Sequence, residues 1–382
     1  MQCPSCGVAN DEDVEACLAC GRSLFFLTLG TLLGGRYEVQ ALLGRGGMGM
    51  VYKAHDRELD EVVALKLLRS DAARSPEMAR RFRSEIKLAR KVRHRNVCAI
   101  HEYGQDGHLQ YIAMEYVEGH DLKTLLRRSG PFPAPEAFDA AIQAAEGLQA
   151  VHEVGIVHRD LKTPNIMRDA RGLVRLMDFG IAKDFEGESS GGATATGQIV
   201  GTPEYMSPEQ VKGEKLDARS DIYALGIVVF ELFTGDVPFR GATVASTLMM
   251  QLQAPLPLEG PAARRLPEPL VGVLRRALEK DRAARFARSA DMAGALAAAR
   301  TESARVQPEA PLTAQGAGMS VAVGPTAVVA AAAPDLTEVP TPAPTPVPAL
   351  DPTPVPRRLP PHPQPALRTV PARPDLAGSA RP

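Results

Sequence analysis

Acidic, amide and basic side chains stand at fixed spacing in the middle of the chain, in HRDLKTPN at 158–165 and DFG at 178–180. Transfer of a phosphoryl group from a nucleotide needs a carboxylate that receives a hydroxyl proton, a cation near the moving phosphate and oxygen ligands for Mg²⁺. These roles suit, in order, Asp160, Lys162, and the pair Asn165 and Asp178. The alternative is a solvated loop followed by a β-turn, so the prediction depends on further parts appearing in order.

A glycine-rich stretch, GRGGMG at 44–49, lies upstream of these residues. In a dinucleotide-binding fold such glycines open a helix. Here they are preceded by a strand-like segment from Tyr37 and followed by another, Val51 to Ala54. The pattern therefore predicts a β-hairpin folded over a nucleotide, in which glycines let backbone amides approach the phosphates.

Lys66 ends an apolar strand-like run, 62–66, so its ammonium is expected to be partly desolvated and to need anions. We expect these anions to be nucleotide phosphates and one carboxylate. From Glu77 to Val92 apolar residues recur at helical spacing, and Glu85 projects into the middle of their stripe. The alternative is a solvated Glu85 beside basic neighbours. We predict that Glu85 pairs with Lys66.

The remaining elements are mainly helical. An apolar strand at 111–119 breaks at a glycine and suits the hinge between two lobes, with Met114 behind an adenine and the backbone of Glu115 and Val117 at its edge. Apolar spacing predicts helices at 135–152, 270–278 and 289–299. The almost continuously apolar run 222–233 predicts a helix buried on all sides and capped by Asp221. We expect Arg285 to be the buried partner of Glu209.

Taken together, residues 37–300 resemble the eukaryotic-like bacterial serine/threonine protein kinases. The resemblance implies an α+β, two-lobed protein kinase fold, with a small β-rich N-lobe and a larger helical C-lobe, that uses ATP and Mg²⁺. It implies Asp160 as catalytic base, assisted by Lys162, and Asn165 and Asp178 as magnesium ligands. It also implies Lys66 with Glu85 at the phosphates. The nucleotide site it implies comprises Leu43, Gly44, Arg45, Gly46, Gly47, Met48, Gly49, Met50, Val51, Ala64, Lys66, Met114, Glu115, Val117 and Asp178.

A soft loop rich in Gly, Ser and Thr follows the second aspartate and contains Thr194 and Thr196. Phosphate on either threonine could order the loop by pairing with the guanidinium of Arg159. Autophosphorylation of this activation loop is therefore expected. Thr202, poised opposite Lys162, matches the pattern of the serine/threonine class of kinase.

Four cysteines form two C-x-x-C-G turns in the first 24 residues. Two such turns can close a tetrahedron around one metal ion, and the polar insert between them cannot build a core. The segment resembles the short zinc ribbons of many bacterial proteins. A disulfide switch and a rubredoxin-like iron site are the alternatives. The expected structural Zn²⁺ ligands are Cys3, Cys6, Cys17 and Cys20.

The domain plan is a zinc ribbon at 1–24, a linker at 25–36, the kinase domain at 37–300 and a disordered Pro/Ala-rich tail at 301–382. Residues 24–33 are either the linker or a flap that packs on the small lobe. The tail is either a docking arm, a substrate of the kinase or a solvated segment without a partner. The net charge is -1 at pH 7 and no apolar run is long enough to span a bilayer, so nucleic acid and membrane are not expected partners. A cytoplasmic protein is expected.

Three classes of function remain open. An active serine/threonine kinase of protein substrates, in bacterial signalling, is the leading prediction. A scaffolding pseudokinase would normally have lost Lys66, Asp160 or Asp178. A small-molecule phosphotransferase would not need the segment 201–209, which in kinases forms the floor of the peptide site. A contact with a partner or a second copy through the zinc ribbon is also expected.

Overall fold

The computed structural model describes residues 7–9, 17–20, 27–46, 49–68, 76–107, 109–178 and 202–306. The chain divides into two units, Met1–Leu312 and Thr313–Pro382, and every described residue belongs to the first. Several expected features therefore lie outside the described residues, namely Cys3, Cys6, Gly47, Met48, Thr194, Thr196 and the part of the Pro/Ala-rich tail beyond residue 306.

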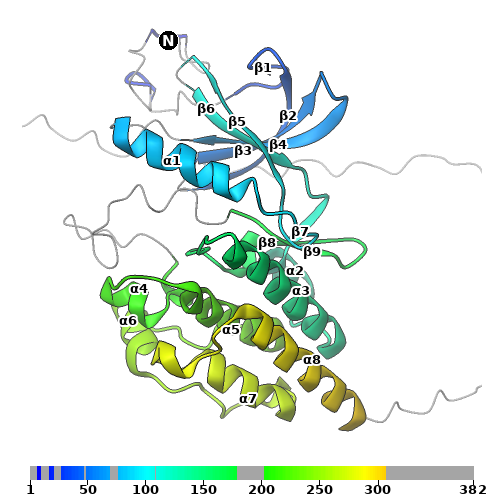
Figure 1. Cartoon of the computed structure of the whole chain (residues 1–382), viewed down its shortest axis with the longest axis vertical. Coiled ribbons are helices and arrows are strands. Elements are labelled where there is room, and N and C mark those ends of the chain that lie inside the picture. The colour runs from blue at the N-terminus through cyan, green and yellow to red at the C-terminus, as the bar shows by residue number, and fades with distance from the viewer. Residues whose placement is uncertain are drawn as a thin grey trace, which may run out of the picture. The chain divides into compact units, whose positions relative to one another are not determined.

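The small lobe is built on a six-stranded antiparallel sheet in the order β1-β2-β3-β4-β6-β5 (Figure 1). The expected glycine-rich hairpin is present, because β2 and β3 pair in antiparallel fashion from Tyr37 opposite Asp56 to Gly46 opposite Gly49. The strands are β1 (Leu32–Leu33), β2 (Tyr37–Gly46), β3 (Gly49–Asp56), β4 (Glu61–Leu68), β5 (Ile100–Asp106) and β6 (Leu109–Glu115).

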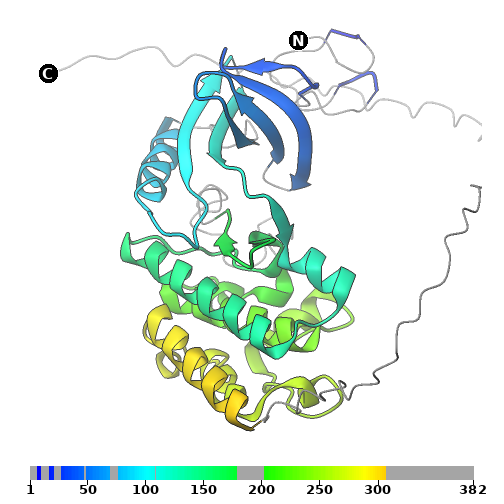
Figure 2. The same cartoon turned by 90° about the vertical axis from the view of Figure 1, so that its right-hand side faces the viewer.

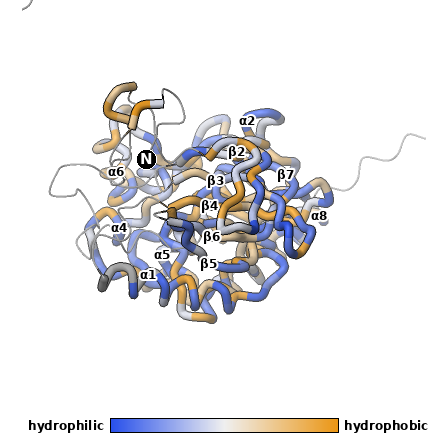
Figure 3. Tube along the Cα trace, turned by 90° about the horizontal axis from the view of Figure 1, so that it is seen from above, coloured by the Kyte–Doolittle hydropathy of each residue, from blue (hydrophilic) through white to orange (hydrophobic). Residues whose placement is uncertain are grey.

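Alternating side chains give this sheet two apolar faces. One face carries Tyr52 and Leu65 in a cluster of its own. The other packs Ala64 and Ile112 against Ile86 of helix α1 (Pro76–Ala89). Figures 1 and 2 show α1 lying along that face, and the tube at β4 in Figure 3 is largely apolar. The helix expected from Glu77 to Val92 is thus present, although it ends at Ala89.

Of the two alternatives for the region before residue 37, a linker or a flap on the small lobe, the structure favours the flap, because the described residues 27–36 pack on the small lobe. Leu27 and Leu33 are buried, and the Leu27 N–H donates to the Tyr52 hydroxyl at 3.0 Å. Gly34 has a φ of 60°, and a Cβ there would lie 2.6 Å from the Tyr111 hydroxyl. The positive φ and this close contact both favour glycine at position 34, and the same segment adds strand β1 to the sheet.

The large lobe is helical apart from a small three-stranded sheet that lies next to the small lobe (Figure 1). Its strands are β7 (Gly119–Asp121), β8 (Ile166–Asp169) and β9 (Val174–Leu176). Its α-helices are α2 (Leu122–Ser129), α3 (Ala134–Glu153), α4 (Pro208–Lys212), α5 (Ala218–Thr234), α6 (Val244–Gln253), α7 (Glu268–Ala277) and α8 (Ser289–Val306). The last helix thus continues six residues beyond the expected domain end at Arg300.

Helix α5 forms the centre of the large lobe, and every residue from Ser220 to Thr234 is buried, as its apolar run predicts. The expected cap at Asp221 is wrong. The helix begins a turn earlier, where the Asp217 side chain accepts the N–H of Arg219. Since Asp221 lies inside the helix, its carboxylate is available for partners elsewhere in the lobe.

A buried ion pair joins α4 to the chain before α8. Arg285 donates to both carboxylate oxygens of Glu209, at 2.8 and 2.9 Å, and both side chains are almost fully buried. The Ser220 hydroxyl adds a third hydrogen bond to the same carboxylate at 2.6 Å. The partnership expected from the sequence is therefore confirmed. In the part of the chain that the structure describes, no helix is both long and apolar enough to cross a membrane.

Candidate active site

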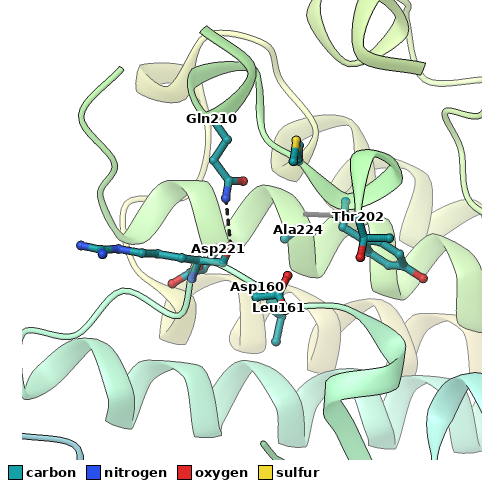
Figure 4. A pocket seen from close by; sticks show the side chains of 9 residues that line it. Asp160, Leu161, Thr202, Gln210, Asp221 and Ala224 are labelled. Carbon is teal, nitrogen blue, oxygen red and sulfur yellow. Dashed lines mark hydrogen bonds between the residues drawn. The ribbon is translucent and has the colours of Figure 1, made fainter. Parts of the chain in front are cut away.

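Asp160 lies at the centre of a polar cluster that joins the loop 158–165 to the segment after residue 201. The Lys162 ammonium lies 3.0 Å from the Asp160 carboxylate and donates to the Thr202 hydroxyl at 3.1 Å. The Asn165 amide donates to the backbone and side-chain oxygens of Asp160 at 2.8 and 3.0 Å. Figure 4 shows Asp160 and Thr202 bordering one pocket. The structure thus brings together four of the residues that the sequence singled out.

Asp221 of α5 anchors the backbone of the loop 158–165. Its two carboxylate oxygens accept the N–H groups of His158 and Arg159 at 2.7 and 2.8 Å, and His152 of α3 contacts the same carboxylate at 2.8 Å. Burial alone would raise the pKa of Asp221, but these contacts with the two histidines outweigh it and lower the pKa. Asp221 is thus an ionised anchor, and Arg159 is held at a φ of 62°, in the left-handed region.

His158 is fully buried beneath Asp160 and is neutral in this environment. One ring nitrogen, Nε2, lies 3.0 Å from the Met177 carbonyl oxygen, and the other accepts the N–H of Asp160 at 3.4 Å. A carbonyl can only accept, so the proton belongs on Nε2. Burial, opposed by Asp221 and Asp160, lowers the pKa of His158. The imidazole therefore supports the loop through both of its ring nitrogens.

The ion pair expected between Lys66 and Glu85 is not formed in this structure, where Lys66 pairs with Asp178. Lys66, nearly buried, places its ammonium 2.7 Å from the Asp178 carboxylate. Burial raises the pKa of Glu85, opposed only by Arg159, and its Oε2 has no hydrogen-bond partner among the described residues. Periodicity correctly turned Glu85 toward the interior, but it could not say which cation α1 would bring it to. Asp178 has a φ of 54°, in the left-handed region.

The glycine-rich hairpin has the geometry required for a close backbone approach. Gly49 has a φ of 134°, and a Cβ there would lie 1.9 Å from the Leu67 carbonyl oxygen, so no other residue fits. Below it, Val51, Ala64 and Met114 share one apolar cluster, as a pocket for an adenine requires. The Glu115 N–H donates to the Ala99 carbonyl at 2.8 Å, which leaves only the carbonyl of that residue for a base edge.

The donor set of Asn165 and Asp178 fits a hard cation. Asn165 uses both amide hydrogens on Asp160, so its side-chain oxygen is turned away from that residue. Asp178 engages Lys66 through one of its two oxygens. Amide and carboxylate oxygens are ligands that Mg²⁺ accepts together with substrate phosphates. Among the described residues, no group of three or more His, Cys, Asp or Glu side chains could hold a metal ion by itself.

A short 3₁₀ helix, η4 (Pro203–Tyr205), forms one wall of the pocket beside Asp160. The Tyr205 hydroxyl bonds to Glu231 of α5, which also accepts from Thr163 at 3.0 Å and from Lys123 of α2 at 2.5 Å. Glu231 is fully buried, and three donors compensate its charge. Sequence analysis missed both Glu231 and Lys123. A single acidic residue within the apolar run of α5 was the available signal.

Of the four expected zinc ligands, only Cys17 and Cys20 lie in the described part of the chain. Cys17 is buried, Cys20 is exposed, and residues 18–20 form a turn. Gly7 has a φ of 73°, the left-handed conformation expected of the glycine after the first C-x-x-C pair.

Comparison with known proteins places the chain in a family. A model of the protein kinase domain matches residues 37–295, and the chain belongs to this family. It is 39% identical over 270 residues to the serine/threonine-protein kinase PrkC of Bacillus subtilis. The match covers 70% of this chain and 41% of that protein. It is 38% identical over 273 residues to PknB of Mycobacterium tuberculosis, which covers 70% of this chain and 43% of that protein.

Solved structures agree with the family assignment. The crystal structure of the M. tuberculosis PknI kinase domain matches with a TM-score of 0.57 and 29% identity, over 72% of this chain and all of that one. The chain spans about two fifths of the length of the curated relatives it matches. The likeness to these relatives is thus a likeness of the kinase domain.

Proposed function

We propose that the chain is a protein serine/threonine kinase that transfers the γ-phosphate of ATP to serine or threonine hydroxyls of proteins. The observation that carries the proposal is the position of Lys162 between Asp160 and Thr202, within about one hydrogen-bond length of each. A hydroxyl acceptor at Asp160 would lie next to this ammonium, which stabilises the charge that develops on the transferred phosphoryl group.

In this proposal each residue of the site has a separate task. Asp160 orients the acceptor hydroxyl and receives its proton, while Asn165 and His158 hold Asp160 in place. Asn165 and Asp178 would hold Mg²⁺, which supplies charge neutralisation at the phosphates when bound. Lys66 and the backbone of the glycine-rich hairpin would bind the phosphates, and Val51, Ala64 and Met114 the adenine.

A peptide acceptor is favoured over a small molecule by the anchoring of η4. Tyr205 is tied to Glu231, and Glu231 to Thr163 of the same loop that carries Asp160. A small acceptor would need no such wall beside the carboxylate. The family relatives named above are serine/threonine kinases, which supports the same class of acceptor.

The Lys66–Asp178 pair suggests that Lys66 and Asp178 separate and bind other groups when the kinase is activated. Binding of phosphates and Mg²⁺ would draw Lys66 and Asp178 to separate ligands, and would leave Lys66 available to Glu85. We further propose that phosphate on Thr194 or Thr196 favours this exchange by engaging Arg159, whose field acts on Glu85 in the present arrangement. An alanine double variant at the two threonines that is as active as the native chain would rule this out.

We also propose that residues 1–24 form a zinc ribbon with Zn²⁺ on Cys3, Cys6, Cys17 and Cys20, which contacts a partner or a second copy. The left-handed Gly7 and the turn at 18–20 support it.

The use of ATP, a cytosolic metabolite, supports a cytoplasmic location. The composition of the tail after residue 306 supports a tether without a core of its own.

The function is tested with the purified full chain, Mg-ATP and myelin basic protein as a generic acceptor. Asp160→Asn removes the proton acceptor and should lower labelling of serine and threonine by roughly 10²- to 10⁴-fold. Asp60→Asn is a matched control, because it makes the same exchange at an aspartate that is 93% exposed and lies in the turn between β3 and β4. Equal labelling by the native and Asp160→Asn chains would refute the assignment.

A further inference from the structure

Helix α6 contacts η4, the wall of the pocket beside Asp160, through one fully buried amide, that of Gln251. Its Nε2 donates to the backbone carbonyls of Pro203 and Glu204, at 3.2 and 2.7 Å. Its Oε1 accepts the hydroxyl of Tyr223 at 2.7 Å. Both amide hydrogens are thus used on η4, and the amide orientation is fixed because carbonyls can only accept.

The two carbonyls lie at a sensitive point of the pocket. They come directly after Thr202, which Lys162 ties to the Asp160 carboxylate, and directly before Tyr205, which lines the pocket. Pro203 has no N–H, so its backbone is anchored through its carbonyl alone. A shift of η4 would therefore move Thr202 and the pocket wall relative to Asp160.

Gln251 is itself held from behind. Lys280 donates to the Tyr223 hydroxyl at 2.9 Å and to the Met250 carbonyl at 3.4 Å, with its ammonium 3.9 Å from the Phe239 ring centroid. Tyr223 and Phe239 are fully buried. The hydrogen bonds run in one direction, because Lys280 donates to the Tyr223 hydroxyl and this hydroxyl donates to Gln251 Oε1. The position of Gln251 is therefore fixed by buried groups on both sides.

We propose that Gln251 is a positioning residue for the acceptor peptide. It fixes the η4 backbone, and thereby the distance between the bound hydroxyl and Asp160, without touching nucleotide or acceptor. The inference rests on the proposed kinase function. It predicts a defect that appears with peptide acceptors and is absent from nucleotide binding.

The test compares Gln251→Glu with Gln253→Glu in the full chain. The first exchange is isosteric and turns two donors toward the carbonyls into acceptors, whereas Gln253 is exposed at the end of the same helix. Loss of two hydrogen bonds predicts about a tenfold or larger rise in KM for a myelin basic protein peptide, or an equal fall in kcat. The KM for ATP and the slow hydrolysis of ATP without peptide should stay within about twofold of native.

Two further measurements separate positioning from loss of folding. Gln251→Met keeps the length of the side chain without adding charge, so it should show the same peptide defect. It replaces Gln251→Glu as the test if the glutamate variant does not fold. A protonated carboxyl can donate one hydrogen bond, so the defect of Gln251→Glu, relative to native, should shrink between about pH 7.5 and about pH 6. Burial and the nearby Arg285 lower the pKa of Lys280 to about 8, which is why the comparison stays below that value.

A native chain that labels no peptide would overturn the proposed function together with this inference. With an active native chain, a peptide KM and kcat unchanged in Gln251→Glu and Gln251→Met would overturn the inference alone. So would an equal loss of peptide labelling and peptide-independent ATP hydrolysis, because that result would assign Gln251 to general stability of the lobe.

Discussion

Lys66 and Asp178, 112 residues apart in the chain, form an ion pair of 2.7 Å across the nucleotide site. The group expected to bind phosphates and the group expected to bind Mg²⁺ are thus one coupled unit. Glu85, the partner expected for Lys66 from its place on α1, lies instead in the field of Arg159.

This pairing predicts that changes to the two residues are not additive. Lys66→Met and Asp178→Ala should each reduce peptide phosphorylation by roughly 10²- to 10⁴-fold, and the double variant should be no worse than the more damaging single variant by more than about tenfold. Residues that act as one unit share the same loss. The measurement is steady-state kcat/KM for the native chain, the two single variants and the double variant. Multiplicative losses would show that the two side chains act independently.

Much of this site was readable from the sequence, because its residues are close together along the chain. Asp160, Lys162 and Asn165 fall within six residues, so any backbone path keeps them near one another. Glu85 and Asp221 show the limit. Glu85 was correctly expected to face the interior, whereas Asp221 was expected to cap α5 and instead lies inside it. Helical periodicity fixes the face of a helix, but not the cation or N–H group that a side chain meets in another element.

Gln251 and Lys123 illustrate a second limit. Each acts through a partner far along the chain, Gln251 on the backbone of Pro203 and Lys123 on Glu231. No local pattern marks such a residue, because a glutamine in a short helix is usually solvated. The segment 25–36 shows the same limit, because the sequence left a linker and a flap packed on the small lobe as alternatives for this region. Only the burial of Leu27 and Leu33 decides for packing on the lobe.

The buried pair of Glu209 and Arg285 predicts a large effect on stability. Removing one partner leaves an uncompensated buried charge, so Arg285→Met should lower the free energy of unfolding by about 3–5 kcal/mol. Arg288→Met is the control, because Arg288 is exposed and pairs with a surface aspartate. Urea denaturation followed by circular dichroism measures both. Equal midpoints for the two variants would contradict the importance of the pair.

The same pair predicts how stability depends on pH. Burial raises the pKa of Glu209, but its bonds to Arg285 and Ser220 outweigh this and lower the pKa below its ordinary value. A carboxyl with a lowered folded pKa stabilises the fold above its unfolded pKa, and this stability is lost as pH falls through the folded pKa. Glu209→Gln should therefore be less stable than native at neutral pH, with a smaller difference in acid. A difference that grows as pH falls would reverse the sign and refute the assignment.

The final prediction concerns the amino-terminal cysteines. If Cys3, Cys6, Cys17 and Cys20 hold one Zn²⁺, the four thiolates fill its tetrahedron and leave no position for a reactive water, so the metal is structural. Native mass spectrometry of the reduced full chain should show one zinc, which is lost in the Cys17→Ser, Cys20→Ser variant. Cys98→Ser is the control, since Cys98 is buried in the small lobe and burial raises its pKa.

The kinase site should be indifferent to this metal, provided that the packed segment is retained. Because Leu27 is buried and bonded to Tyr52, a shortened chain should begin at Leu27, and one that begins at Thr31 should be less stable. The first should phosphorylate a peptide at the native rate, and the cysteine variant should do the same. Freshly purified, reduced protein without zinc would refute the metal site. An inactive chain from Leu27 that still unfolds cooperatively would instead show that residues before 27 contribute to the active site.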